Sequence, residues 1–441
     1  MRGDRDQKVD GAREQSADGL ALPGRALTAL TTSALAIPGI VTPAPARADT
    51  PIEQATSSYA FSVYKEDNLV RNRRFVPGGG SSKRYEVLTH QFQVDLPVSK
   101  RMDAGVDFLY EKMSGASPWY VQASGNERVQ VMSGATIDDT RYDVSGRLSY
   151  YMDDAKDTIT GGVSKEQDYL SVHGGIGTER SFFDKNTTFS TSGSFSYDWI
   201  TPNNPQVSRG VRPTSGEKWS VDLFGGLTQL LTRASAIQAT INYKHSDGYL
   251  SDPYKAIITV DPNQGLLSDN RPDLKDQTSL LLRYRHHLEP ISASVHFDYR
   301  FYVDTWQVTS HTFELAWHQN LFGWLTIIPG ARYYSQSKAE FYDTILPRVV
   351  NHRSSDFRLS PYGAVSWKVK AEASLEDLFD YRAGSRAEAF GFSGGLDLFL
   401  AFSYERYISD GAFAIKSVAA RDEAPALVNF QIFAFTLTGR F

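Results

Sequence analysis

The sequence predicts an all-β protein, a closed antiparallel transmembrane β-barrel of about sixteen strands (~14–18), with short periplasmic turns and long extracellular loops. From Tyr59 onward, apolar and polar residues alternate along long segments. Aromatic residues make up 12% of the chain, although its mean hydropathy is −0.36. The gaps between segments are short and long in turn, and no apolar run reaches the ~18 residues of a membrane-spanning helix.

The segment "ISASVHFDYRFYVD" (291–304) shows the alternation most clearly. Val295, Phe297 and the other apolar residues fall on one face, while Ser294, Asp298 and the other polar residues fall on the opposite face. Segments 187–200 and 237–245 have the same pattern. Strands of a soluble β-sandwich are usually about five or six residues long, whereas a run of ~14 residues can cross a bilayer with tilt.

Aromatic residues gather near the ends of these segments, as they do in the interfacial girdles of outer-membrane barrels. They are Tyr59, Tyr64, Tyr110, Tyr150, Tyr151, Trp199, Tyr333, Tyr334, Tyr404 and Tyr407. A closed barrel is the β architecture that leaves no backbone unpaired in lipid, so it fits this pattern.

The gaps set the strand count. Short gaps lie near 97–100, 152–156, 183–186, 231–235, 289–290 and 320–323, and long gaps near 69–82, 113–139, 201–217, 250–274, 336–355 and 408–427. Three gaps break this alternation. The gaps near 168–170 and 304–306 are short at positions where the alternation predicts long gaps, and 371–388 is long where it predicts a short gap. Counting all of them gives about sixteen strands with both ends on the same side.

The segment "VNFQIFAFTLTGRF" (428–441) is predicted to close the barrel by pairing with the first strand near Tyr59. Phe433, Phe435, Leu437 and Phe441 share one parity. This pattern resembles the C-terminal signature that barrel-insertion machinery recognises. That machinery and outer-membrane lipid are therefore expected partners.

Residues 1–48 are predicted to be a leader and signal peptide. An apolar stretch follows Arg25, and Ala46-Arg47-Ala48 forms a small-residue cleavage site. We expect cleavage after Ala48, a mature N-terminus at Asp49, and a barrel domain spanning 49–441 that reaches the bacterial outer membrane through the periplasm. The alternative, a buried N-terminal helix, is opposed by prolines in the stretch.

Composition excludes several classes of function. The chain has no cysteine, which excludes disulfides, thiol catalysis and Cys-ligated metals. The net charge of −5 comes from scattered charges of both signs, which predicts no nucleic-acid partner. We find no serine-nucleophile elbow or HExxH motif and expect no cofactor.

Eight local strings, in order along the chain, resemble the bacterial family known as domain of unknown function 3570. They are "YKEDN" (64–68), "SGASPW" (114–119), "DDTRYDVSGRLSYY" (138–151), "SKEQDYLS" (164–171), "NTTFSTSGSFSYD" (186–198), "SDGYLSDPYK" (246–255), "DYRFYVDTW" (298–306) and "RYYSQSKAEFY" (332–342). The resemblance implies an outer-membrane barrel of uncharacterised activity. It implies no catalytic or binding residues.

Charged residues on the polar parity form the first candidate site: Arg283, Arg285, Asp298, Arg300 and Asp304. Charged rings in a pore select ions by sign, and these arginines would favour anions modestly. The alternative is a salt-bridge network that holds a loop or plug.

A second candidate, His296, Glu314 and His318, also falls on the lumen parity. A three-residue turn at 304–306 would place His296 opposite Glu314. Such a cluster could bind a metal or relay a proton, but a hydrogen-bonded polar cluster is the favoured interpretation, so no metal site is assigned.

The third candidate is the loop base "SDGYLSDPYK", where Asp252 could help bind Ca²⁺ but is expected instead to fix a turn. The leading hypothesis for the whole chain is a pore or transport channel for small solutes through a polar lumen. The alternative is a plugged scaffold barrel that docks another periplasmic or surface protein, and a distant third is a hydrolase. Segment 371–389 could occlude the lumen or hang in the periplasm.

Overall fold

The computed structural model describes residues 51–69, 74–76, 81–116, 118–125, 127–132, 137–202, 215–261, 263, 265–375, 377–378, 397–415 and 425–440. The predicted signal peptide, Phe441 and most of segment 371–389 lie outside these ranges. No helix within the described ranges is long and apolar enough to cross a membrane.

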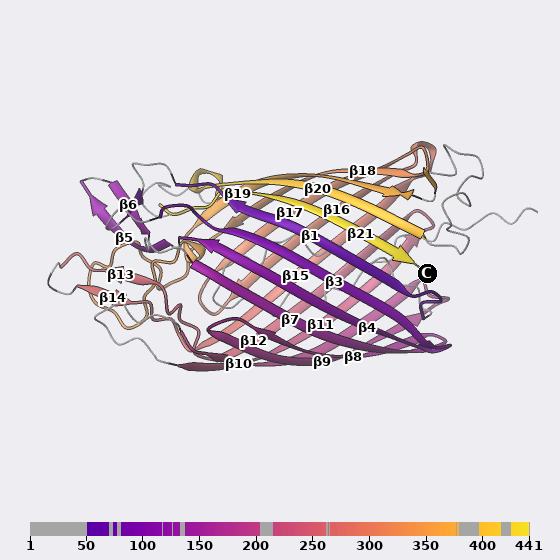
Figure 1. Ribbon diagram of the computed structural model, residues 1–441, viewed down its shortest axis with the longest axis horizontal. Coiled ribbons are helices and arrows are strands. Elements are labelled where there is room, and N and C mark those ends of the chain that lie inside the picture. The colour runs from indigo at the N-terminus through magenta and orange to yellow at the C-terminus, as the bar shows by residue number, and fades with distance from the viewer. Residues whose placement is uncertain are drawn as a thin grey trace, which may run out of the picture.

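Sixteen antiparallel strands form a closed barrel (Figure 1). In ring order they are β1 (Thr56–Glu66), β3 (Glu86–Ser99), β4 (Met102–Gly115), β7 (Ile137–Met152), β8 (Ala155–Lys165), β9 (Tyr169–Phe182), β10 (Thr187–Ile200), β11 (Gly216–Thr232), β12 (Ser235–Gly248), β15 (Leu274–Leu288), β16 (Ala293–Asp304), β17 (Thr309–Leu321), β18 (Leu325–Gln336), β19 (Tyr362–Ser374), β20 (Asp397–Asp410) and β21 (Phe430–Arg440). The predicted fold class and strand number are confirmed.

The closing contact joins the two ends of the strand series. β21 pairs with β1 in a continuous antiparallel register in which Tyr59 lies opposite Leu437 and Val63 opposite Phe433. The predicted closure near Tyr59 is therefore confirmed. The aromatic residues of β21 pack across both seams, since Phe435 also lies 5.0 Å, between ring centroids, from Phe402 on β20.

The alternation predicted from sequence divides each strand into an outer apolar face and an inner polar face. On β15 and β16, Leu282 and Phe297 are 48% and 41% exposed on the outer face. The inner positions beside them hold Arg283 and Asp298, which lie directly opposite each other. The outer apolar band is the surface that a lipid-embedded barrel requires.

The two ends of the barrel differ. At one end, most strands are joined by short turns, such as the one between Met152 and Ala155, while residues 375–396 join β19 to β20 at this end. At the opposite end, long connections carry extra elements: a three-stranded sheet of β2 (Arg74–Phe75), β5 (Pro118–Ser124) and β6 (Glu127–Met132), and the hairpin of β13 (Ala256–Ile258) and β14 (Leu266–Ser268). In Figure 1 these extra strands lie at the end away from the C-terminus.

Three 3-10 helices are assigned with full bounds in the described part of the chain. η4 (Glu289–Ile291) makes a short turn, whereas η5 (Phe357–Leu359) and η7 (Gly411–Phe413) belong to long connections. The tight connection between β16 and β17 is residues 305–308, one residue longer than the predicted turn at 304–306 and displaced along the chain. This difference changes the pairing of one candidate cluster, described below.

Candidate functional site

The inner face of β15–β19 carries more cations than carboxylates, and we call it the basic arc. The cations are Lys275, Arg283, Arg285, Arg300, Arg332, Lys368 and Lys370, and the carboxylates are Asp298, Asp304, Glu314 and Glu372. Seven cations and four carboxylates give this inner face a formal charge of +3. The next strand, β20, adds Asp397 and Glu405, and Oε1 of Glu405 lies 3.6 Å from Nη1 of Arg332.

Four residues of the basic arc form a row across neighbouring strands. Arg283, Asp298, Glu314 and Arg332 occupy directly paired positions on β15, β16, β17 and β18. Nε of Arg283 lies 3.5 Å from Oδ2 of Asp298, and Nε of Arg332 donates to Oε2 of Glu314 at 3.0 Å. Arg285 also donates to Asp298. This row is a salt-bridge network between neighbouring strands, and the predicted network that holds a loop or plug stays a prediction.

Arg300 differs from these paired residues. It occupies an inner position near the middle of β16, yet its side chain is exposed. Among the described residues it forms no hydrogen bond or ion pair. Glu314, although paired, is also 42% exposed. Space for solvent therefore exists inside the barrel at this depth, and a charged guanidinium faces it.

Asp304 lies apart from the other four predicted lumen charges. It is buried at the long-loop end of β16. Its Oδ1 accepts hydrogen bonds from the backbone N–H groups of Trp306 and Val308 at 3.0 and 2.9 Å, and its Oδ2 lies 3.1 Å from Nζ of Lys275. Asp304 thus fixes the β16–β17 connection.

The predicted pairing of His296 with Glu314 is wrong. Because the connection between β16 and β17 is longer than expected, the register moves by two residues, so His296 lies opposite Ala316 and Glu314 lies opposite Asp298. His296 and His318 still meet, with ring centroids 3.9 Å apart. The structure therefore separates the carboxylate from the two imidazoles.

The inner face of β3, β4 and β7 has the opposite charge, and we call it the acidic arc. Its carboxylates are Asp95, Asp103, Asp107, Glu111, Asp139 and Asp143, and its cations are Arg141 and Arg147. Six carboxylates and two guanidinium groups give a formal charge of −4. The sequence analysis missed this arc, although Asp103 and Asp107 share the polar parity of "MDAGVDFLY" and could have been found by it.

Two arginines tie the acidic arc together. Nη2 of Arg147 lies 2.7 Å from Oδ1 of Asp95 and 3.4 Å from Oδ1 of Asp103. Nη1 of Arg141 lies 3.5 Å from Oε2 of Glu111. These contacts hold several carboxylates close together without cancelling their summed charge.

The two arcs face each other across the barrel. In the ring of sixteen strands, β4 and β16 are eight strands apart in either direction. Asp107 and Asp298 are each the sixth residue of their strand from the short-turn end, and so are Arg147 on β7 and Arg283 on β15. At this depth each arc therefore carries one carboxylate and one arginine.

On one side of the ring, the strands between the two arcs carry equal numbers of positive and negative inner residues. Their inner positions, on β8–β12, carry Lys156, Lys218 and Lys244 against Glu179, Asp198 and Asp222. Three cations and three carboxylates cancel, so this side of the inner wall carries no net charge between the two arcs.

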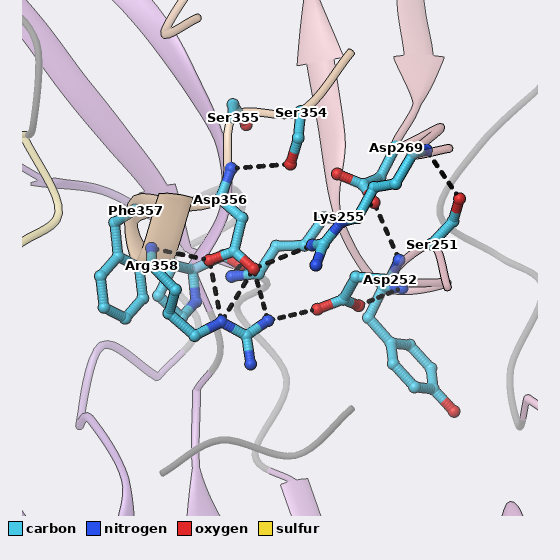
Figure 2. Close-up of polar contacts among 12 residues, drawn as sticks. Ser251, Asp252, Lys255, Asp269, Ser354, Ser355, Asp356, Phe357 and Arg358 are labelled. Atoms are coloured by element: carbon cyan, nitrogen blue, oxygen red, sulfur yellow. Dashed lines mark hydrogen bonds and ion pairs between the residues drawn. The ribbon is translucent and has the colours of Figure 1, made fainter. Parts of the chain in front are cut away.

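Above the lumen, a buried ion-pair cluster joins two long connections, residues 249–273 and 337–361 (Figure 2). We call its members the loop lock. They are Asp252, Lys255, Asp269, Arg271, Asp356 and Arg358. Nη2 of Arg271 lies 2.9 Å from Oδ2 of Asp356, and Nη2 of Arg358 lies 2.7 Å from Oδ2 of Asp252. Backbone hydrogen bonds between Asn270 and Arg353 join the same two connections.

The loop lock perturbs the acidity of its members. Burial alone would raise the pKa of Asp356, but Arg358, Lys255 and Arg271 together hold that pKa well below its usual range. Burial raises the pKa of Asp269 against the opposing effect of Arg271. Burial also lowers the pKa of Lys255. Asp356 is the centre of the cluster because all three cations stabilise its ionised form.

The connection 337–361 also packs into two apolar clusters at the barrel rim. Ala339, Tyr342 and Leu359 pack with Trp306 beside the β16–β17 connection. Phe357 packs against the cluster of Tyr64, Val87, Val428, Phe430 and Ile432 from β1, β3 and the end of the chain. This connection therefore extends over much of the mouth at the long-loop end.

Asp252 has the turn-fixing contact expected from sequence. Its Oδ1 accepts a hydrogen bond from the backbone N–H of Tyr254 at 2.9 Å, and its Oδ2 pairs with Arg358. A separate carboxylate group, Asp139, Glu166 and Asp168, places three ligand-type oxygens within 4.8 Å of one another. Tyr254 donates a hydrogen bond to Asp168, and nothing else about the group indicates a ligand.

The fold and its lipid-facing band define the class: this is a barrel of the outer-membrane type. The model of a family described as a protein of unknown function (DUF3570) matches residues 27–389, and the chain belongs to that family. The predicted family resemblance is thereby confirmed. No curated protein matches the sequence.

Several solved structures are similar in overall shape. A siderophore receptor, PirA from Pseudomonas aeruginosa, is 11% identical over 81% of this chain and has a TM-score of 0.38, and this chain covers only 56% of that receptor. A bacterial polysaccharide outer-membrane secretin is 9% identical over 88% of this chain and 98% of its own, with a TM-score of 0.45. A BenF-like porin from Pseudomonas fluorescens Pf-5 is 9% identical over 88% of this chain and 98% of its own, with a TM-score of 0.40. Such distant similarities assign no function to this chain.

Proposed function

We propose that the protein is an outer-membrane channel that passes small polar solutes through its charged lumen. Arg300 is the observation that carries this proposal. It is a charged side chain at an inner, mid-strand position, exposed and without an ion pair or hydrogen bond among the described residues. A barrel filled by packed side chains would bury such a group or pair it, because an unpaired buried charge is costly. A barrel of sixteen strands is wide enough for an aqueous channel.

The loop lock supports a second candidate, a plugged scaffold barrel. Two long connections are joined by buried ion pairs, and Phe357 packs onto the inner rim formed by β1 and β3. If these connections close the mouth completely, the barrel would present a rigid outer surface to a partner protein. The two candidates differ in one property, passage of ions.

Conductance across planar lipid bilayers separates them. We expect the purified wild-type protein to insert and give discrete current steps in symmetric salt. Asp356→Asn, which weakens the loop lock, should give larger or noisier steps. Silent bilayers from folded, heat-modifiable wild-type protein would contradict the channel. Steps from Asp356→Asn alone would favour the plugged scaffold.

As part of the same proposal, we place this barrel in the bacterial outer membrane. An apolar outer face, an inner polar face and short turns at one end suit the bacterial outer membrane, with the short turns in the periplasm and the long connections outside. Export through the periplasm would use the leader 1–48, and insertion would use the closing strand with Phe433, Phe435 and Leu437. Phe441, the last residue of the predicted insertion signature, lies outside the described residues.

A further inference from the structure

The outer face of β1 and β3 carries four rings that meet across the two strands, and we call them the first quartet: Tyr59, Phe61, His90 and Phe92. Phe61 lies directly opposite His90, and Tyr59 lies opposite Phe92. The ring centroids of Tyr59 and Phe92 are 4.8 Å apart, and those of Phe61 and His90 are 5.0 Å apart. The hydroxyl group of Tyr59 reaches diagonally to His90 and shares a hydrogen bond of 2.9 Å with its Nδ1.

Strands β16 and β17 repeat this arrangement with the second quartet: Tyr299, Phe301, His311 and Phe313. Phe301 lies opposite His311, and Tyr299 lies opposite Phe313. The corresponding centroid distances are 4.8 Å for the Tyr–Phe pair and 5.3 Å for the Phe–His pair. The hydroxyl group of Tyr299 shares a hydrogen bond of 2.9 Å with Nδ1 of His311. The same four residue types therefore occupy the same cross-strand positions twice.

Both quartets lie toward the long-loop end of the outer apolar band. His90 is the fifth residue of β3 and His311 is the third residue of β17, and both strands begin at the long-loop end. Phe92 and Phe313 are 47% and 40% exposed. Aromatic residues at this edge of the band lie at headgroup level in outer-membrane barrels. In the proposed membrane location, each quartet therefore faces lipid where the acyl chains meet the headgroups.

Each imidazole of the two quartets has one ring nitrogen left for a partner outside the protein. The tyrosine hydroxyl groups bond to Nδ1 of His90 and His311, and neither histidine has a further hydrogen bond or ion pair among the described residues. When a tyrosine donates to Nδ1, the neutral imidazole carries its proton on Nε2 and is a donor there. A donor at the lipid surface costs free energy until an acceptor reaches it.

From these observations we infer that the two quartets are equivalent binding sites for the phosphate group of a membrane lipid in the outer leaflet. This inference rests on the proposed outer-membrane location. Nε2 of His90 or His311 donates a hydrogen bond to a phosphate oxygen, and hydrogen bonds to an ionised acceptor are stronger than neutral ones. The exposed phenylalanine rings pack against the acyl chains of the same lipid. The tyrosine hydroxyl fixes the orientation of the imidazole.

Native mass spectrometry of the purified protein in detergent tests the inference with two matched probes. Dimyristoylphosphatidylglycerol carries a phosphate group, and dimyristoylglycerol has the same acyl chains without it. The wild-type protein should hold two molecules of the phospholipid about tenfold more tightly than dimyristoylglycerol, as one hydrogen bond to a charged group predicts. A large excess of inorganic phosphate should not displace the phospholipid, because phosphate alone lacks the acyl chains.

Variants at the imidazoles identify the two sites. His90→Phe and His311→Phe keep an aromatic ring but remove the donor, so each should lower the number of tightly bound phospholipid molecules from two to one. The double variant should bind none tightly. The matched control is His286→Phe, at an outward position near the short-turn end of β15, which should leave both molecules bound. A shift in gel mobility on heating checks that every variant is folded.

Three results would overturn the inference. They are equal affinity for the two probes, two phospholipid molecules still bound tightly by the folded double variant, and displacement of the phospholipid by inorganic phosphate, which would indicate simple anion sites. Bilayer conductance tests the proposed channel separately. Current steps from a protein without phospholipid preference would leave the channel standing, whereas silent bilayers would contradict the channel even if both lipid sites were found. Failure of the protein to float with lipid vesicles would contradict the membrane location itself.

Discussion

Phe297 and Ser294 lie on opposite faces of β16, and substitutions at the two residues should therefore differ in their effect on stability. Phe297 lies on the exposed apolar face of β16, and Ser294 lies on the inner face with its Oγ 3.2 Å from Nε2 of His296. We expect Phe297→Arg and Val295→Arg each to destabilise the inserted barrel by about 2–4 kcal/mol, since they place a charge in lipid. Ser294→Arg should be much milder because its side chain enters a polar interior.

Unfolding in urea, followed by tryptophan fluorescence of protein in lipid vesicles, gives the free energies for these variants. If Phe297→Arg, Val295→Arg and Ser294→Arg all lower the free energy of unfolding equally, β16 has no lipid-facing side.

Asp356 makes the outer connections sensitive to acid. Its pKa is lowered in the folded protein, so its stabilising effect is complete above its ordinary value of 3.8 and is lost as the pH falls below that value. Asp269, whose pKa is raised by burial, acts in the opposite direction as it takes up a proton. The ion pairs of Asp356 with Arg271 and Arg358, together with the nearby charge of Lys255, make it the larger contributor.

We expect Asp356→Asn to reduce the stability of connections 249–273 and 337–361 by about 3–5 kcal/mol at neutral pH, because it leaves Arg271 and Arg358 without a central carboxylate. Limited trypsin digestion of intact protein should then cut these connections first. Asp261→Asn is the matched control, since Asp261 is exposed in connection 249–273 and, among the described residues, its side chain accepts a hydrogen bond only from the N–H of Asn263. Equal digestion of the two variants would mean that Asp356 does not hold the connections together.

At the level of strands, the sequence predicts those features that depend on residues close together in the chain. Alternation with a period of two follows from the geometry of each strand, so the existence, facing and number of strands could be predicted. The closing pair of β21 with β1 followed from the same argument. The boundary of the β16–β17 connection is not determined by this alternation. The actual boundary shifts the register of the two strands by two residues, so Glu314 does not lie opposite His296.

The candidate site was only partly predictable for the same reason. Arg283, Arg285, Asp298 and Arg300 were found because they stand on one strand pair with clear alternation. The acidic arc was missed because its opposition to the basic arc depends on the ring order of strands far apart in the sequence. The loop lock was missed because Arg358 and Asp252 are 106 residues apart, and no local pattern connects them.

At the level of the whole molecule, the leader remains a prediction. Ala46-Arg47-Ala48 is expected to direct cleavage, so protein extracted from outer membranes should begin at Asp49. N-terminal sequencing of the membrane-inserted protein measures this directly. Replacing Ala48 with a bulky residue, Ala48→Phe, should block processing, with Thr50→Ala as the control beyond the cleavage site. Membrane-inserted wild-type protein that still carries residues 1–48 would refute the signal-peptide interpretation.

The loop lock also bears on the order in which the protein assembles. Its two connections follow β12 and β18, so its ion pairs form only after both regions of the barrel have reached the outer side. We expect contacts between residues so distant in sequence to form after the transition state for folding, and contacts of that kind slow unfolding without speeding folding. The lock therefore contributes to the lifetime of the assembled barrel. In a membrane where a protein is replaced only slowly, that lifetime determines how long each copy persists.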